Sequence, residues 1–251
     1  MKGIVLVLMT CLLLPLLIGE ANSQVTMNAL TRVLYLNYKG NVGTAFTIEV
    51  DDRQYLVTAR HVVSGIGEKD TIRIFHEKEW KNLDVKVLRI SPPQVDIAVL
   101  IPPQQLSPVL PLEPTMAGIM LAQQVYFLGF PYGLHQYVGD LNRGFPMPFV
   151  KSGVCAAIDH QGEKGYSLIY VDGMVNPGFS GGPLLFKSSK DGQFKVAGVV
   201  SSYRIHPAQV IGMESAKELI ALENSGIFHA YSIATAVSII KQHPEGPKVA
   251  K

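Results

Sequence analysis

Short apolar runs, each separated from the next by turn residues, recur along this chain and constrain its fold more than any other feature. The first half contains RVLYLNY, GTAFTIEV, QYLVTA, TIRIF, DVKVLRI and DIAVLI. These runs are rich in Val, Ile, Leu and Tyr, and the turn sequences DD, SGIG and SPP divide them, which is the pattern of β-strands at near-regular spacing. The sequence therefore predicts an all-β protein built as a sandwich or barrel.

A proline-rich stretch, IPPQQLSPVLPLEPT at residues 101–115, interrupts this rhythm and indicates an extended connection between two halves. The second half resumes with QQVYFLGF, VKSGVCAAID, YSLIYVDG, GPLLF and FKVAGVVSS. Residues 234–242 have apolar positions spaced for one face of a helix, which ends before Pro244, and residues 214–223 favour another short helix. We expect residues 243–251 to form a flexible tail.

Residues 1–23 have the layout of a secretory signal peptide. Lys2 precedes an apolar run from Ile4 to Ile18, and a polar stretch with small residues follows, so that cleavage after Ser23 fits an A-x-A-like site. A membrane anchor is the alternative, but a proline interrupts the run, which is shorter than the about 20 apolar residues that a spanning helix needs. We therefore expect a secreted or periplasmic protein that has no membrane contact after cleavage of the signal.

Charge and cysteine content narrow the class further. Loss of Lys2 and Glu20 with the signal changes the counts from 22 basic and 20 acidic residues to 21 and 19, so nothing in the charge favours nucleic acid as a partner. Cys155 is then the one cysteine, which excludes an internal disulfide, and we expect it to be a buried core residue. The absence of disulfides and of an Asn-x-Ser/Thr sequon favours a bacterial protein.

Ser180 lies in Gly178-Phe179-Ser180-Gly181-Gly182, and two chemistries use glycines in this way. A G-x-S-x-G nucleophile elbow needs a helix directly after the serine, whereas the strand-like LLF follows here, which disfavours this alternative. In the other chemistry, the glycines let backbone N–H groups converge on a developing oxyanion. That chemistry needs a histidine and an aspartate earlier in the chain, in the order His, Asp, Ser.

His61 and Asp96 meet this requirement. His61 ends the apolar run YLVTARH, and Asp96 opens the buried-looking strand DIAVL. A buried carboxylate is costly unless it is paired, and the imidazole N–H of His61 is a natural partner. Taken alone, such a histidine is more often a surface or core residue and such an aspartate a turn residue, but the order and the three settings together favour a triad of His61, Asp96 and Ser180.

The segments TARHVV, DIAVL, NPGFSGGPLL and AGVVSS, in this order, resemble the trypsin/chymotrypsin-like serine endopeptidases. The likeness covers roughly residues 40–242 and is nearest to the bacterial branch that includes the Deg/HtrA proteases. It implies two perpendicular six-stranded antiparallel β-barrels with a C-terminal helix. The N-terminal barrel at residues 24–115 would carry the histidine and aspartate, and the C-terminal barrel at residues 116–242 would carry the serine and the closing helix. No PDZ domain is expected after that helix.

The resemblance also implies the role of each residue. His61 takes the Ser180 proton, Asp96 orients the imidazole, and the N–H groups of Gly178 and Ser180 bind the oxyanion. In animal trypsins an aspartate precedes the serine and pairs with a freed N-terminus during zymogen activation. The corresponding residue here is Phe179, so that switch cannot operate.

The residues that correspond to the specificity pocket also depart from trypsin. Met174 takes the position of the acid that selects Arg or Lys, so we do not expect cleavage after basic residues. Ser201, Ser202 and Tyr203 match the strand that lines the pocket and pairs with the substrate backbone, and Tyr203 replaces a glycine that keeps a trypsin pocket open. The sequence thus predicts a shallow apolar pocket for small or medium aliphatic side chains.

The expected function is that of a secreted or periplasmic serine endopeptidase, which acts on protein or peptide substrates through an acyl-enzyme. The alternative is a catalytically silent homologue that serves as a protein-binding module, since a fold does not guarantee a function. The histidines show no metal-ligand spacing, so we expect neither a metal site nor a cofactor. The sequence leaves the oligomeric state open, and the loop at residues 135–149 could contact substrate or cover a barrel face.

Overall fold

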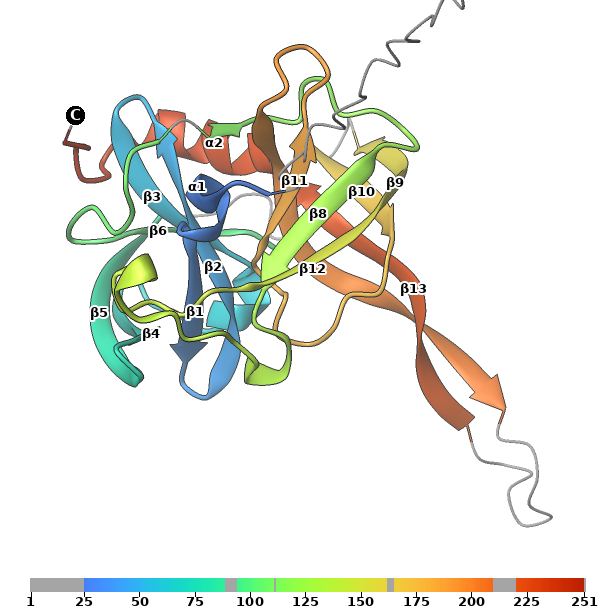
Figure 1. The fold of residues 1–251 in the computed structure, drawn as a ribbon, viewed down its shortest axis with the longest axis horizontal. Helices are drawn as coiled ribbons and strands as arrows, with labels where there is room; N and C mark the ends of the chain where they lie inside the picture. The colour runs from blue at the N-terminus through green and yellow to red at the C-terminus, as the bar shows by residue number, and fades with distance from the viewer. Residues whose placement is uncertain (1–24, 89–93, 111, 162–164, 210–219, 251) are drawn as a thin grey trace, which may run out of the picture.

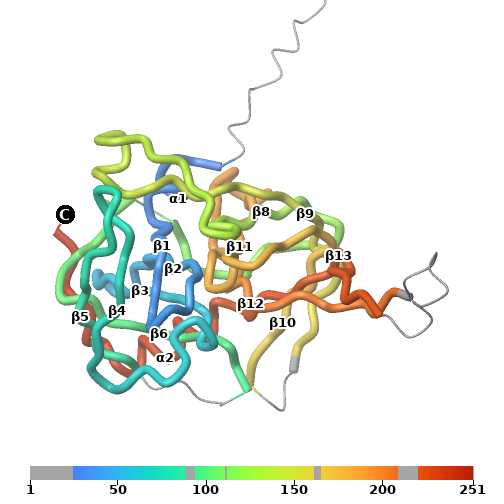
Figure 2. Tube along the Cα trace, turned by 90° about the horizontal axis from the view of Figure 1, so that it is seen from below, coloured from blue at the N-terminus to red at the C-terminus, as the bar shows by residue number. Residues whose placement is uncertain are grey.

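The computed structural model describes residues 25–88, 94–110, 112–161, 165–209 and 220–250. The predicted signal peptide lies outside these residues. The chain forms two lobes, which lie side by side in Figure 2, with β1 to β6 in one lobe and β8 to β13 in the other. The helices are α1 (Met27–Leu30) and α2 (Ile233–Gln242), and the short 3₁₀ helices are η1 (Arg60–Val63), η2 (Pro131–Gly133) and η3 (Gly139–Asn142).

The N-terminal lobe is a closed barrel of six antiparallel strands in the order β1-β2-β3-β6-β5-β4. The strands are β1 (Val33–Tyr38), β2 (Asn41–Val50), β3 (Arg53–Thr58), β4 (Lys69–His76), β5 (Glu79–Leu88) and β6 (Ala98–Ile101). Each apolar run of the first half therefore forms one strand, as its length and its β-branched residues predict.

The C-terminal lobe contains seven strands in the order β11-β8-β9-β10-β13-β12-β7, and a further pairing of β11 with β12 joins six antiparallel strands into a ring. The strands are β7 (Glu113–Pro114), β8 (Gln124–Gly129), β9 (Phe149–Gln161), β10 (Tyr166–Asp172), β11 (Pro183–Lys187), β12 (Phe194–Gln209) and β13 (Ile220–Ser232). The short β7, from the proline-rich stretch, adds in parallel to β12. The predicted fold class, with two six-stranded antiparallel sheets and a C-terminal helix, is confirmed (Figure 1).

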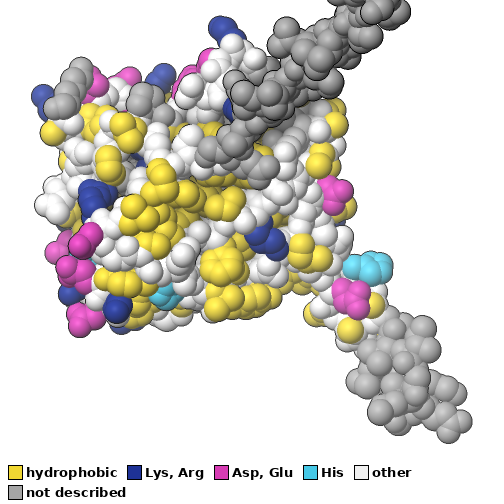
Figure 3. Space-filling model, in the orientation of Figure 1, with side chains coloured by type: hydrophobic (Ala, Val, Ile, Leu, Met, Phe, Trp, Pro, Cys, Tyr) yellow, Lys and Arg dark blue, Asp and Glu magenta, His cyan; other side chains and the backbone are white. Residues whose placement is uncertain are grey.

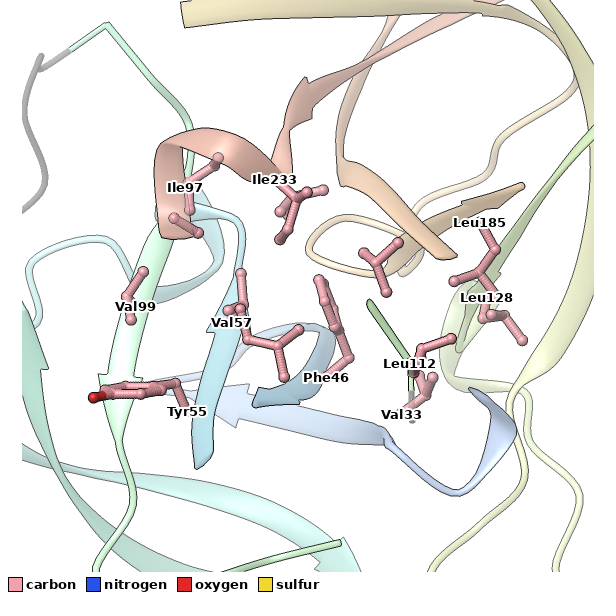
Figure 4. Close-up of a cluster of buried hydrophobic side chains, with 14 of the residues drawn as sticks. Val33, Phe46, Tyr55, Val57, Ile97, Val99, Leu112, Leu128, Leu185 and Ile233 are labelled. Atoms are coloured by element: carbon pink, nitrogen blue, oxygen red, sulfur yellow. The ribbon is translucent and has the colours of Figure 1, made fainter. Parts of the chain in front are cut away.

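Buried apolar side chains form three clusters. One fills the N-terminal barrel, one fills the C-terminal barrel and includes Cys155, and the third lies between the lobes and beneath α2. The strand β1 serves two of them because successive side chains of a strand point to opposite faces: Leu34 and Leu36 face the barrel interior, whereas Val33 contributes to the third cluster. Figure 4 shows this third cluster, in which Val33 and Phe46 lie among side chains of both lobes and of α2. Shared burial therefore fixes the lobes relative to each other.

The strands β12 and β13 extend beyond the lobe as a projecting hairpin (Figures 1 and 2). Their pairing continues to Gln209 and Ile220, and the hairpin exposes the apolar side chains of Ile205, Ile220 and Leu222. The predicted helix at residues 214–223 is wrong where the structure describes it, since residues 220–223 pair with β12. The remainder of that segment lies outside the described residues.

The C-terminal tail also differs from the expected flexible segment. The N–H of Gln54 donates to the Pro247 carbonyl and the N–H of Val249 donates to the Asp52 carbonyl, both at 3.0 Å. These bonds place the tail beside the start of β3, which β6 does not reach, so that the tail pairs with backbone groups there.

The loop at residues 135–149 packs on the N-terminal barrel. His76 Nε2 bonds to the Arg143 carbonyl at 2.8 Å, and the His76 and Phe145 rings lie 4.3 Å apart. The segment at residues 132–150 includes this loop and exposes the large apolar side chains of Tyr132, Leu134, Tyr137, Leu141, Phe149 and Val150. Figure 3 shows apolar side chains gathered in the middle of the face that it displays. The contacts show that the loop covers a barrel face, which was one of the two alternatives.

Candidate active site

The pairing of β3 with β6 brings His61 and Asp96 together. β3 ends at Thr58, which lies opposite Ala98 at the start of β6. His61 follows β3 in η1, and Asp96 lies two residues before β6. The next residues of η1 are buried valines that anchor this turn in the barrel core. The position of the pair is thus a direct result of strand order.

Asp96 accepts three hydrogen bonds. Its Oδ2 lies 2.7 Å from Nδ1 of His61, and its Oδ1 accepts the His61 backbone N–H at 2.9 Å. The Ser201 hydroxyl also donates to Oδ2, at 2.5 Å. The two bonds to His61 fix the imidazole relative to the backbone, with its Nε2 turned away from the carboxylate. Half of the His61 side-chain surface remains exposed, at 50%.

The pKa of the Asp96 carboxyl lies below its ordinary value of 3.8. Burial opposes the ionised form, but hydrogen bonds from His61 and Ser201 outweigh that effect. Because the folded-state pKa is lowered, the carboxylate stabilises the fold at pH values above 3.8, and this contribution is lost as the pH falls through the folded-state pKa. At neutral pH Asp96 is ionised and can stabilise an imidazolium at His61.

Ser180 follows a tight turn that its neighbours dictate. Pro177 and Gly178 take the central positions of a β-turn, which the Phe179 N–H closes onto the Asn176 carbonyl at 3.2 Å. Gly178 has a φ of +103°. This is the type II arrangement, which favours proline at the first central position and glycine at the second.

The turn packs against both lobes. Phe179 is fully buried, and its ring meets that of Phe127 edge-on at 5.2 Å in the C-terminal core. A Cβ atom at Gly178 would lie 2.2 Å from the Phe130 carbonyl oxygen, and one at Gly181 would lie 2.1 Å from that of Thr44, on β2 of the other lobe. No side chain fits at these positions, which explains the glycines around Ser180.

The carbonyl oxygens from Pro177 to Ser180 are all occupied by donors. These are Tyr132 N–H to Pro177 (2.9 Å), the Thr44 hydroxyl to Gly178 (2.6 Å), Gly182 N–H to Phe179 (2.8 Å) and Thr44 N–H to Ser180 (2.9 Å). In contrast, the N–H groups of Gly178 and Ser180 donate to no acceptor among the described residues. Two uncommitted donors beside a serine hydroxyl are what the stabilisation of an oxyanion requires.

The Ser180 hydroxyl donates to the Ser201 carbonyl at 3.0 Å. Within the described part of the chain it makes no hydrogen bond to His61. Hydrogen bonds of catalytic groups are often long or misaligned before substrate binds. Ser201 therefore links Ser180 to Asp96, because its carbonyl accepts from the Ser180 hydroxyl and its own hydroxyl donates to Asp96. The sequence predicts Ser201 as part of the substrate-binding strand but does not predict the bond from its hydroxyl to Asp96. The serine at this position is the only sequence signal for that bond.

The predicted specificity residues Ser201, Ser202 and Tyr203 lie in the middle of β12, and Met174 lies in the connection between β10 and β11. Met174 is half exposed, Ser202 is exposed and Tyr203 is partly buried. Val175 is buried in the same apolar cluster as Phe228, and Tyr203 packs against that cluster. The side chain of Met174 therefore lies at the surface rather than in the core of the lobe.

The sequence of residues 43–214 matches the profile of the family described as "Trypsin-like peptidase domain". The chain belongs to this family. The resemblance drawn from the motifs is thereby confirmed. No curated protein matches the chain by sequence.

Solved structures show that this trypsin-like peptidase shares its fold with HtrA-type proteases. The HtrA-type protease AlgW with tripeptide has 23% sequence identity and a TM-score of 0.55, and the match covers 87% of this chain and 62% of AlgW. A serine endoprotease from Yersinia pestis has 19% identity and a TM-score of 0.52, with coverage of 86% and 63%. The inactive form of Rv3671c from M. tuberculosis, a serine-to-alanine mutant, has 19% identity and a TM-score of 0.51, with coverage of 88% and 90%. The chain spans less than two thirds of the length of AlgW and of the Yersinia pestis endoprotease.

The described residues of this trypsin-like peptidase contain no group of three His, Cys, Asp or Glu side chains that could hold a metal ion. None of its described helices is both long and apolar enough to cross a bilayer.

Proposed function

We propose that this chain is a secreted or periplasmic serine endopeptidase that cleaves peptide bonds with a triad of His61, Asp96 and Ser180. The observation that carries the proposal is the orientation of His61 by an ionised Asp96, whose Oδ2 bonds to the imidazole Nδ1 and whose Oδ1 accepts the His61 backbone N–H. The serine turn of the same chain adds two uncommitted N–H donors. This combination supplies a base, a group that orients it and an oxyanion site.

The reaction begins when an extended substrate pairs with β12. A substrate backbone N–H donates a hydrogen bond to the Ser201 carbonyl and displaces the Ser180 hydroxyl from it. The hydroxyl can then turn toward Nε2 of His61. The Ser180 oxygen then attacks the peptide carbonyl carbon while its proton passes to Nε2. The oxygen of the tetrahedral intermediate receives hydrogen bonds from the N–H groups of Gly178 and Ser180.

Collapse of this intermediate breaks the carbon–nitrogen bond, and His61 returns the proton to the leaving amine. Water then attacks the acyl-enzyme, with His61 again as the base, and hydrolysis restores the Ser180 hydroxyl. Asp96 stays ionised throughout and stabilises the imidazolium that forms twice in each cycle. Protein or peptide is the substrate class that a trypsin-like peptidase domain favours.

We propose a preference for small or medium aliphatic residues on the acyl side of the cleaved bond. Met174 offers no carboxylate to a basic side chain, and Tyr203 replaces a glycine that keeps a trypsin pocket open. Digestion of an unfolded protein, with mass spectrometry of the products, should show cuts mainly after Ala, Val, Leu or similar residues. A majority of cuts after Arg or Lys would contradict this preference.

The export step is tested separately. Expression of the full chain in a bacterium should yield a protein in the periplasm or medium whose N-terminal residue is Gln24, because the sequence predicts cleavage after Ser23. N-terminal sequencing of that fraction measures the site. A chain that keeps residues 1–23 and sediments with membranes would show an anchor instead.

A further inference from the structure

The segment at residues 174–180, here called the oxyanion loop, carries both proposed oxyanion donors. Its conformation depends on side chains that reach it from distant elements. The carbonyl of Met174 accepts a hydrogen bond from the Lys151 ammonium, and that of Val175 accepts one from the Asn224 amide at 2.6 Å. Together with the bonds described above, these give every carbonyl of the loop a donor.

Lys151 reaches the oxyanion loop from β9, where its backbone lies opposite Phe127 of β8. Its ammonium donates to the Met174 carbonyl and to Oδ1 of Asn176, the latter at 2.9 Å. It also lies 5.9 Å from the centroid of the Phe179 ring, within the range of a cation–π contact. One side chain thus contacts both ends of the type II turn.

The partly buried position of Lys151 disfavours the charged form of its side chain. Burial therefore lowers the pKa of Lys151 below its ordinary value. The ion pairs of the described residues do not include Lys151. In the part of the chain that the structure describes, no carboxylate offsets the lost hydration of the ammonium. The Met174 carbonyl, the amide oxygen of Asn176 and the Phe179 ring do so instead. The contacts of this charge are therefore all made to the oxyanion loop.

The geometry of the turn shows what the loop would do without this restraint. Types I and II of a β-turn differ by a flip of the central peptide, here the one that joins Pro177 to Gly178. A flip would exchange the positions of the Pro177 carbonyl and the Gly178 N–H, and it would put an acceptor where the oxyanion needs a donor. Asn176 precedes this peptide, and its side chain is held between Lys151 and the Tyr132 hydroxyl.

We propose that Lys151 is a positioning residue for the oxyanion hole. Its ammonium, fixed on β9, holds the oxyanion loop in the type II turn and so keeps the Gly178 N–H directed at the developing oxyanion. Lys151 touches no substrate and acts through the backbone of the loop. The inference rests on the proposed function. It adds that a cation of the folded chain, the Lys151 ammonium, orders the oxyanion loop, so that ordering this loop needs no freed N-terminus of the kind used by animal trypsins.

The main test compares Lys151→Met with the wild type. We expect kcat to fall about 10²-fold, the size of effect that follows loss of an oxyanion donor or a misplacement of about 1 Å, while KM changes less than about threefold. The affinity for a peptidyl boronic acid, whose adduct with Ser180 places a charged oxygen in the hole, should fall in parallel. Lys69→Met, at an exposed lysine of β4 in the other lobe, is the matched control and should leave both values unchanged.

A chemical rescue separates positioning from simple packing. Lys151→Cys is alkylated either with 2-bromoethylamine, which rebuilds an ammonium at the length of lysine, or with bromoethane, which gives a neutral side chain of similar length. Cys155 is fully buried and burial raises its pKa, so it should not react. We expect the ammonium product to regain most of the lost kcat and the neutral product to regain none.

Two results would overturn the proposal: a kcat of Lys151→Met within about threefold of wild type, or equal rescue by the neutral and charged products. Hydrogen exchange of the peptide at residues 174–180 is followed in parallel because it needs no activity. Faster exchange in Lys151→Met supports the restraint, and unchanged exchange contradicts it. If the wild type itself forms no fluorophosphonate adduct at Ser180, the proposed function fails, and the exchange data still decide the role of Lys151.

Discussion

Replacement of Ser180 by alanine should lower turnover about 10⁶-fold, the loss expected when a serine triad loses its nucleophile. The hydroxyl is the only group of the protein that forms a bond to the substrate carbon in the proposed mechanism. The residual rate should come from substrate binding and the two N–H donors alone. Release of peptides from an unfolded protein, compared for Ser180→Ala and wild type, measures the effect.

The matched control for this variant is Ser189→Ala, at an exposed turn between β11 and β12. It removes the same atom from a serine outside the proposed site and should keep wild-type turnover. Equal melting temperatures for the three proteins would show that the fold is unaffected. Unchanged proteolysis by Ser180→Ala would end the assignment of this serine as the nucleophile.

The Asp96→Asn variant should lose about 10⁴-fold of turnover, the magnitude for loss of this carboxylate from a triad. Oδ2 of Asp96 accepts from Nδ1 of His61. An asparagine amide can present its NH₂ group there instead, so that Nδ1 becomes the acceptor and the proton moves to Nε2. His61 can then no longer accept the Ser180 proton, and the negative charge that stabilises the imidazolium is also lost.

The fall should appear in kcat with little change in KM, since Asp96 does not contact substrate. Asp51→Asn, at an exposed turn between β2 and β3, is the matched control. Steady-state kinetics with a peptide substrate measures both variants. If Asp96→Asn retained activity within tenfold of wild type, the hydrogen bond between Asp96 and His61 would have no catalytic role.

The strand pattern was sufficient to predict the two lobes, because each apolar run has the length and composition of one strand. The residues of the proposed triad could be named from their order and because each lies at the end or start of such a run. The helix expected at residues 214–223 shows the limit of local propensity. ESAKELIALE has the composition of a helix, yet residues 220–223 pair with β12, and a long-range pairing outweighs a local preference of a few tenths of a kcal/mol per residue.

The contacts that position the site could not be predicted, because their partners lie far apart in the sequence. Thr44 binds two carbonyls of the oxyanion loop from the other lobe, and Lys151 and Asn224 bind two more from separate strands. No spacing in the sequence indicates these pairs. The bond from Ser201 to Asp96 and the packing of the tail against β3 were missed for the same reason.

The central claim is that Ser180 is an activated nucleophile, and covalent labelling tests it most directly. The folded mature protein is treated with a fluorophosphonate, and mass spectrometry locates the adduct. We expect one adduct, on Ser180, in the wild type, and none in a His61→Ala variant that melts at the same temperature. A well-folded wild-type protein without an adduct on Ser180 would contradict the claim and would favour a catalytically silent homologue.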